Sequence, residues 1–341
     1  MSARLRLGLA GLGSMGRNHL RNISNHSDTT LTAVADPEPS ALEAAVAQTQ
    51  AQGFADPLEM IEKAHLDALV VAAPTTYHLS LAMAAIERGI PVLVEKPIAA
   101  SVEDALAIVA AAARRHVPVQ VGHVERYNPA VVEMGRLLRG GALPAVYTIQ
   151  SRRAGPFPAR IRDVGVTIDL GTHDVDMLSW IVGERPTRVY AETARRIHTG
   201  HEDLLFGLMR FPSGATGFLD VDWLTPAKRR NLVVVGDKGM FELDYLTQNL
   251  TFTSSNLERP ELIDGYATTF SGNVAKIDVN IVEPLKAQLD EFVRVLRGGG
   301  RPEVDAEDGL WAVRLAHALL TAASQHRPVD LPILPEGLRK E

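Results

Sequence analysis

The chain has 341 residues, which is more than one typical domain of roughly 100–200 residues holds, so we expect two domains. Its net charge of −6 argues against general attraction to nucleic acid or to an anionic membrane. The absence of cysteine excludes disulfides, thiolate metal sites and thiol nucleophiles, and no stretch approaches the roughly 20 apolar residues that span a bilayer. We therefore expect a cytoplasmic protein.

Apolar strands alternate with helical patterns through the first third of the chain. The expected strands are residues 5–10, 31–36, 67–74, 91–95 and 118–123. The expected helices are residues 15–27, 39–52, 77–89 and 101–116. Strands that are apolar throughout are buried on both faces, as in parallel sheets. The alternation predicts a doubly wound α/β domain, a Rossmann fold, over residues 1–123.

The remaining residues, 124–341, predict a second domain of α+β type. After a helix over 128–140, β-like segments are expected at 145–153, 187–196, 204–211, 215–222, 230–236, 239–244 and 248–254. Asp237-Lys238-Gly239 reads as a hairpin turn, which favours an antiparallel sheet. Helices over 284–297 and 305–324 follow. One face of the sheet should be exposed, and apolar residues in 204–211 and 216–224 should cover it against a partner subunit.

The first strand runs into a dinucleotide-binding pattern, Gly11-x-Gly13-x-x-Gly16. Such a turn lets the backbone approach a pyrophosphate at a helix N-terminus. The second strand ends in Asp36, which would accept hydrogen bonds from ribose hydroxyls and repel a 2′-phosphate, so NAD is favoured over NADP. The expected cofactor contacts of this turn are Gly11, Leu12, Gly13, Ser14, Met15 and Gly16.

Ligands of open α/β sheets bind at the carboxyl ends of the strands. The residues standing there predict further cofactor contacts at Ala73, Pro74, Thr75, His78, Glu95, Lys96 and His123. His78 could equally be a helix-start residue packed on the backbone. Arg126 and Tyr127 follow the fifth strand and could bind substrate or pack at the domain joint. Lys96, at the tip of an apolar strand, is placed to reach a substrate oxygen.

A second cluster joins a carboxylate to an imidazole. Asp169 and His173 are four residues apart, so they share one face of a helix. Such a carboxylate supports the imidazolium form, which suits a proton acceptor. The alternatives are an ordinary surface pair, or a zinc site with His123 as a third ligand. We expect no metal.

Together these features resemble the Gfo/Idh/MocA oxidoreductase family. The resemblance rests on the glycine pattern, Asp36, and the segments APTTYH (73–78), VEKP (94–97), DLGTHDVD (169–176), VVGDKGMFELD (234–244) and EPLKAQLDEFVRVLRGG (283–299). It implies a Rossmann domain, a second domain with an open antiparallel sheet, and oxidation of a carbohydrate-type alcohol with NAD(P) in a homodimer or homotetramer. It assigns Lys96 to the reacting hydroxyl and His173, with Asp169, to proton transfer. It also predicts a cis bond between Lys96 and Pro97.

The segments VGHVERYNPAV (121–131) and GPFPARIRDVGVTIDLGTHDVD (155–176) resemble the UDP-N-acetylglucosamine 3-dehydrogenase branch of this family. That branch oxidises the sugar 3-hydroxyl to a ketone. A diphosphate needs cations, and Arg126, Arg152, Arg153, Arg160 and Arg162 are candidates. In place of the paired glycines common before the Asp-x-x-x-His motif, this chain has Val164-Gly165-Val166. The alternatives are a dehydrogenase of a free polyol such as myo-inositol, an NAD-dependent glycosidase, and a regulatory NAD-binding protein.

Overall fold

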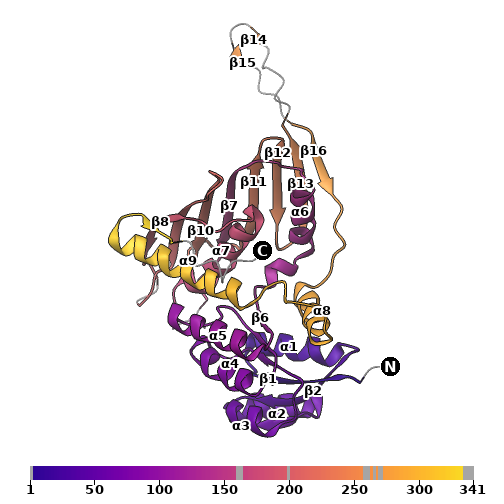
Figure 1. Cartoon of the computed structure of the whole chain (residues 1–341). Coiled ribbons are helices and arrows are strands. Elements are labelled where there is room, and N and C mark those ends of the chain that lie inside the picture. Colours follow the sequence, from indigo (N-terminus) through magenta and orange to yellow (C-terminus); the bar gives the residue numbers. More distant parts are fainter. Residues whose placement is uncertain are drawn as a thin grey trace. The chain divides into compact units, whose positions relative to one another are not determined.

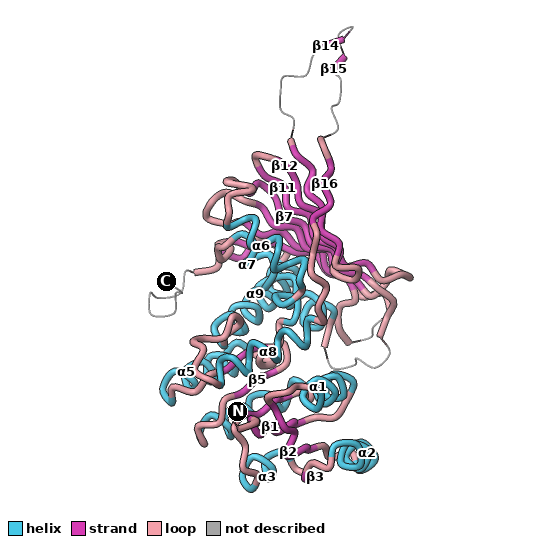
Figure 2. Tube along the Cα trace, turned by 90° about the vertical axis from the view of Figure 1, so that its right-hand side faces the viewer, coloured by secondary structure: helices cyan, strands magenta, loops and turns pink. Residues whose placement is uncertain are grey.

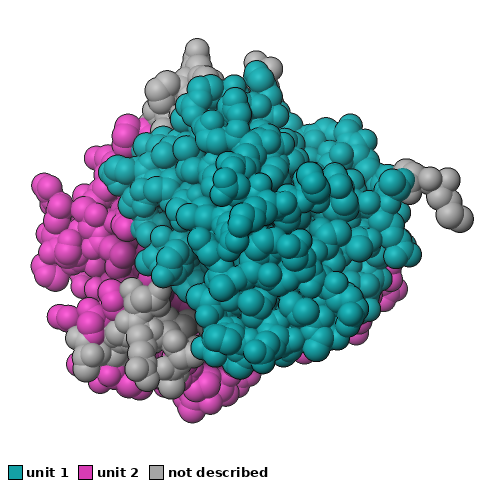
Figure 3. Space-filling view, turned by 90° about the horizontal axis from the view of Figure 1, so that it is seen from below, with its two compact units in different colours: residues 1–127, 283–314 teal, residues 128–282, 315–341 magenta. Residues whose placement is uncertain are grey.

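The structure is a computed structural model, which describes residues 3–158, 164–197, 200–255 and 272–332 and the backbone of 262–263 and 266–267. The chain divides into two compact units (Figure 3). Unit 1 comprises residues 1–127 and 283–314, and unit 2 comprises residues 128–282 and 315–341. Over the described ranges, no helix is long and apolar enough to cross a lipid bilayer.

Unit 1 contains a six-stranded, fully parallel sheet in the order β3-β2-β1-β4-β5-β6 (Figures 1 and 2). The strands are β1 (Leu5–Ala10), β2 (Thr29–Ala35), β3 (Gln52–Phe54), β4 (Ala68–Val71), β5 (Val92–Val94) and β6 (Val119–Val121). The helices are α1 (Ser14–Asn25), α2 (Pro39–Thr49), α3 (Pro57–Lys63), α4 (His78–Glu87), α5 (Val102–Arg115) and α8 (Pro284–Leu296), with short 3₁₀ turns η1 (Thr75–Tyr77) and η2 (Val124–Tyr127). This strand order is that of a dinucleotide-binding sheet, which confirms the predicted Rossmann fold.

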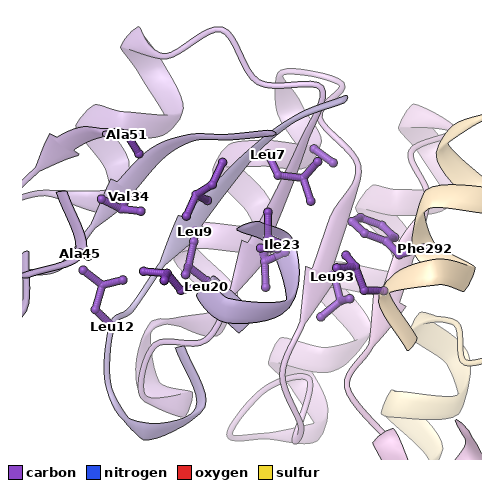
Figure 4. Close-up of a cluster of buried hydrophobic side chains, with 14 of the residues drawn as sticks. Leu7, Leu9, Leu12, Leu20, Ile23, Val34, Ala45, Ala51, Leu93 and Phe292 are labelled. Atoms are coloured by element: carbon purple, nitrogen blue, oxygen red, sulfur yellow. The ribbon is translucent and has the colours of Figure 1, made fainter. Parts of the chain in front are cut away.

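The core of unit 1 includes a helix from the far end of the chain. Leu289, Phe292 and Val293 of α8 belong to the same buried cluster as Leu9 and Leu93 of the parallel sheet (Figure 4). The sequence assigned all of 124–341 to a second domain, whereas residues 124–127 and 283–314 lie in unit 1. The apolar stripe of α8 predicts a helix with one buried face, but periodicity does not say which sheet that face covers.

Unit 2 contains a nine-stranded sheet in the order β16-β13-β12-β11-β7-β10-β9-β8-β17. The strands are β7 (Val146–Ala154), β8 (Arg188–Ala194), β9 (Leu204–Arg210), β10 (Thr216–Asp222), β11 (Arg229–Gly236), β12 (Gly239–Asp244), β13 (Asn249–Ser254), β16 (Val274–Ile277) and β17 (Val329–Asp330). Every neighbouring pair is antiparallel except β7 with β10, which makes the sheet mixed. Two short strands, β14 (Leu262–Ile263) and β15 (Tyr266–Ala267), pair separately.

The helices of unit 2 are α6 (Pro129–Arg139) and α7 (Thr172–Val182), and α7 continues from a π-helical segment, η3 (Thr167–Gly171). Helix α9 (Ala306–Gln325) begins in unit 1 and ends in unit 2. The expected hairpin is present: Gly236 pairs with Gly239, so β11 and β12 are joined by Asp237 and Lys238. The sequence missed β3 and α3, because a three-residue edge strand and a seven-residue helix are too short to show a period.

Candidate active site

The glycine turn after β1 has the geometry of a dinucleotide cradle. Gly11 has a φ of 94°, which disfavours other residues, and a Cβ there would collide with the backbone of Ala72 and Ala73 after β4. At Gly16 a Cβ would collide with the Gly11 carbonyl. At Gly13, by contrast, a Cβ would meet nothing within 4 Å in the described chain. The backbone is therefore open to a ligand at the one position where a pyrophosphate must approach.

Asp36 stands just beyond the end of β2 and is fixed by two backbone N–H groups. Leu12 donates to Oδ2 at 2.6 Å, and Glu38 donates to Oδ1 at 2.9 Å. Each carboxylate oxygen keeps a second lone pair, so the group can still accept hydrogen bonds from two ribose hydroxyls. The same charge would repel a 2′-phosphate. The open Gly13, the uncapped start of α1 and Asp36 together fit NAD.

Glu95, which directly follows β5, is held by contacts with neighbouring elements of unit 1. Glu95 is buried, and its Oε1 lies 2.7 Å from His19 Nε2, which belongs to α1. Its Oε2 accepts the backbone N–H of Lys96 at 3.2 Å, and a Cβ on Gly122 would lie 2.8 Å from that oxygen. Glu95 was predicted as a cofactor contact, but the structure makes it a buried link between β5, α1 and β6.

The buried Glu95 carboxylate remains ionised. Burial is the largest influence and would raise its pKa. The hydrogen bond with His19 and the electrostatic influence of His19 and Lys96 outweigh burial, so the pKa of Glu95 lies below its ordinary value. A negative charge thus stands directly before Lys96 in the chain.

Lys96 is half-buried, and its peptide bond to Pro97 is cis, as predicted. His78 supports the same loop. Its Nδ1 lies 2.8 Å from the Pro97 carbonyl and its Nε2 lies 2.9 Å from the Ala73 carbonyl. Burial lowers the pKa of His78, and a neutral imidazole donates to one carbonyl at a time. His78 therefore packs on the backbone, which was the alternative to a cofactor contact, and joins the loops after β4 and β5.

The residues after β6 are buried within unit 1. His123 is 1% exposed, and Arg126 forms an ion pair with Asp308 at 3.7 Å. The Tyr127 hydroxyl donates to Glu291 Oε2 of α8 at 2.9 Å. Burial and the neighbouring Glu291 charge raise the pKa of Tyr127. For Arg126 and Tyr127 this arrangement matches the packing alternative rather than a substrate contact.

In unit 2, Asp169 and His173 are both half-buried, but the helix that carries them is not uniform. Asp169 lies in the π-helical segment η3, and His173 lies in the first turn of α7. The sequence assumed one regular α-helix. A π-helical segment has i→i+5 hydrogen bonds and frequently occurs at functional sites.

The neighbour of His173, Asp174, anchors this helix to the sheet. Ser151 Oγ donates to Asp174 Oδ1 at 2.6 Å, and Arg153 Nε donates to Oδ2 at 2.7 Å. Arg153 is 1% exposed and its guanidinium also lies 5.3 Å from the Tyr245 ring centre. Arg153 was predicted as a substrate contact, and this buried ion pair argues against that role. No structural role was predicted for Asp174, because its burial depends on a contact with Arg153, which lies 21 residues earlier in the sequence.

Of the other arginines predicted to bind a diphosphate, one lies in the sheet of unit 2 and two lie outside the described residues. Arg152 forms an ion pair with Asp220 of the neighbouring strand β10 at 3.1 Å. Arg160 and Arg162 lie outside the described residues. Within the described residues, no group of three or more His, Asp or Glu side chains could hold a metal ion.

We predict that Glu95→Gln removes part of the acid sensitivity of the protein. The folded pKa of Glu95 is depressed, so its ionisation stabilises the fold above the ordinary value of 4.5, and this contribution is lost as the pH falls through the lower folded value. At pH 7 the variant should be about 1–2 kcal/mol less stable, because a neutral amide replaces a charged acceptor. Chemical denaturation from pH 7 to pH 3 measures this.

The control is Glu43→Gln, which changes an exposed glutamate of α2 and should shift stability by less than about 0.5 kcal/mol. If Glu95→Gln retained the pH dependence of the wild type, the Glu95 carboxylate would not be the group that titrates.

Family profiles match both units of the chain. A profile described as oxidoreductase family, NAD-binding Rossmann fold, matches residues 5–123. A second, described as GFO/IDH/MocA C-terminal domain, matches residues 131–242. Together they cover more than half of the chain.

Individual relatives are dehydrogenases of different substrates. Inositol 2-dehydrogenase 2 of Saccharopolyspora erythraea is 34% identical over 56% of this chain, and the aligned part spans 58% of that protein. UDP-N-acetylglucosamine 3-dehydrogenase of Acidithiobacillus ferrooxidans is 26% identical over 72% of this chain and 76% of its own length.

Among solved structures, the WlbA dehydrogenase from Bordetella pertussis in complex with NADH and UDP-GlcNAcA superposes with a TM-score of 0.81. It is 26% identical and the match covers 97% of this chain and 99% of that chain. The glycine cradle and the two profiles lead to one conclusion: the chain is an oxidoreductase of the Gfo/Idh/MocA family with an NAD-binding Rossmann domain.

Proposed function

We propose that this chain is an NAD-dependent dehydrogenase that oxidises a secondary hydroxyl of a sugar to a ketone. The observation that carries the proposal is Lys96, a half-buried lysine at the carboxyl end of β5 in a sheet that also presents the open Gly13 turn and Asp36. Ligands of such sheets bind at this edge. A cation there is suited to polarise the oxygen of an alcohol.

Each proposed catalytic group has one role. Lys96 donates a hydrogen bond to the reacting hydroxyl oxygen and orients it. His173 accepts the hydroxyl proton as the carbon–oxygen bond becomes a double bond, and the Asp169 carboxylate supports the resulting imidazolium. NAD, when bound, supplies the hydride acceptor. The Asp174 ion pair acts on none of the reacting atoms and holds the helix that carries His173.

For the substrate, we propose a UDP-sugar, with UDP-N-acetylglucosamine and its 3-hydroxyl as the first candidate. The likeness to WlbA and to the Acidithiobacillus enzyme supports this class. Because Arg126 and Arg153 form buried ion pairs inside their own units, Arg152, Arg160 and Arg162 are the remaining candidates of the original group for the diphosphate. A free polyol such as myo-inositol is the second candidate, which the 34% identity to an inositol 2-dehydrogenase favours.

The substrate proposal predicts that NADH accumulates when the protein is mixed with NAD and UDP-N-acetylglucosamine. Absorbance at the nicotinamide band measures this, with a carbonyl-trapping reagent present because the oxidation is unfavourable. Myo-inositol and free N-acetylglucosamine should give no signal. Turnover of myo-inositol alone would support the second candidate, and glycoside cleavage without NADH would support a glycosidase instead.

The roles proposed for Lys96 and His173 predict that replacing either by alanine lowers kcat at least about 100-fold, because the first variant loses the group that orients the hydroxyl oxygen and the second loses the proton acceptor. NAD binding, followed by titration of protein fluorescence, should stay within about twofold of the wild type, since neither residue builds the glycine cradle. The control is Lys63→Ala, which removes an exposed lysine that pairs with Glu59 on α3. Unchanged turnover in either active-site variant would refute the role assigned to that residue.

We also propose that the chain forms a homodimer or homotetramer through the open face of the nine-stranded sheet. Phe206, Leu208 and Phe218 are 52%, 42% and 41% exposed, and Phe218 pairs directly with Leu208. Their strand neighbours Leu205 and Leu219 are buried on the other face. Clustered exposed apolar side chains on a sheet indicate a surface that another molecule covers.

The oligomer proposal predicts that the double variant Leu208→Lys, Phe218→Lys shifts the protein toward monomer, because two buried charges would oppose association. Light scattering after size exclusion measures the mass. Leu106→Lys, on an equally exposed leucine of α5, should leave the mass unchanged. A wild-type protein that is already monomeric at micromolar concentration would contradict the proposal.

A further inference from the structure

The loop before the helix of Asp169 and His173 is held by a residue from a distant part of the chain. Glu202 lies 35 residues beyond Thr167, and its Oε1 accepts the Thr167 backbone N–H at 3.1 Å. The Glu202 carbonyl accepts the Val166 N–H at 3.0 Å. The Gly165 carbonyl, in turn, accepts the Asp169 N–H at 3.0 Å. The segment from Gly165 to Asp169 is therefore hydrogen-bonded both to Glu202 and within itself.

Gly165 makes room for this contact. A Cβ at position 165 would overlap the carboxylate of Glu202, and Gly165 itself is buried. Its φ does not lie in the left-handed region, so the requirement for glycine here is one of space rather than backbone conformation. The Glu202 carboxylate is the end of a flexible side chain, so a methyl group at position 165 would push it away from the Thr167 N–H.

The Glu202 carboxylate lies at the N-terminus of a helix, where a negative charge is stabilising. The first N–H groups of a helix have no acceptor within the helix, and the positive end of its dipole favours an anion. Thr167 is the first residue of η3, which continues directly into α7. In the first turn of α7, the Asp174 carboxylate accepts hydrogen bonds from Ser151 and Arg153 of β7. Asp169 and His173 thus lie between two anchors, one at Thr167 and one at Asp174.

We propose that Glu202 is a positioning residue that holds Asp169 and His173 in place for proton transfer, with Gly165 as the position that admits its carboxylate. This inference rests on the proposed function for the catalytic role of His173. Glu202 itself touches none of the reacting atoms.

The test compares Glu202→Ala, Glu202→Gln, Gly165→Ala and the double variant Gly165→Ala, Glu202→Ala. Glu202→Ala should lower kcat about 10- to 100-fold, because displacing a reacting group by about 1 Å costs up to this much. Glu202→Gln should retain most activity, because its amide oxygen can accept the Thr167 N–H. Gly165→Ala should lower kcat as Glu202→Ala does, and the double variant should be no worse than either, because both changes break one contact.

Two readouts separate positioning from a general loss of structure. NAD affinity should stay within about twofold of the wild type, since the cradle belongs to unit 1. The His173 Cε1–H resonance, assigned with His173→Gln, should move in Glu202→Ala and Gly165→Ala but not in Glu202→Gln. The matched control is Glu184→Ala, which also removes a carboxylate that accepts a backbone N–H, from Ser213 at 3.0 Å, and it should behave as the wild type.

An unchanged His173 resonance in both Glu202→Ala and Gly165→Ala, or effects on kcat that add in the double variant, would overturn the inference. The resonance does not depend on any substrate. If it moves as expected while the wild-type protein oxidises none of the sugars tested, the positioning by Glu202 stands and the proposed function fails. Gly165→Ala keeps the test decisive if Glu202→Ala does not fold.

Discussion

The hydrogen bond between Glu95 and His19 is the interaction on which unit 1 depends. Glu95 ends the strand that presents Lys96, and His19 lies on the helix that begins at the glycine turn. A buried ionised carboxylate is tolerated only when it is paired, so the 2.7 Å contact joins these two elements at a fixed place. Because Gly122 has no side chain, the backbone that follows β6 can approach the same carboxylate. Of the adjacent acid and base in the sequence, Glu95 therefore holds the strand end in place through its buried carboxylate.

Charge pairing inside each unit also limits what the arginines can recognise. Arg126 and Arg153 are both nearly inaccessible, and each is opposed by a carboxylate in its own unit. Removing such a cation from its partner to bind a ligand would leave a buried charge without compensation, which is strongly unfavourable. The number of arginines near a motif is therefore a poor measure of how many can bind a phosphate.

The features that the sequence predicted well are those that depend on neighbours along the chain. The glycine spacing, the acid that ends β2 and the hairpin at Asp237 each follow from local backbone requirements, and the structure contains all three. The candidate site was predicted less fully where a role depends on distant residues. Glu95 was correctly placed at the end of a strand, but its burial was not predicted. No role was predicted for Asp174 or Glu202, because their hydrogen-bond partners are 21 and 35 residues away in the sequence. The spacing of residues along the chain also could not predict the π-helical segment that contains Asp169.

The placement of α8 has a consequence for biosynthesis. A ribosome completes all six strands of the parallel sheet by residue 121, yet the core of this sheet also includes Phe292 and Val293. Until those residues emerge from the exit tunnel, part of the apolar surface that α8 covers stays open to water and to chaperones. Nearly the whole of unit 2 is translated in the interval. The cofactor domain, although first in the sequence, thus reaches its finished core only after most of the second unit has been made, which links the maturation of the two.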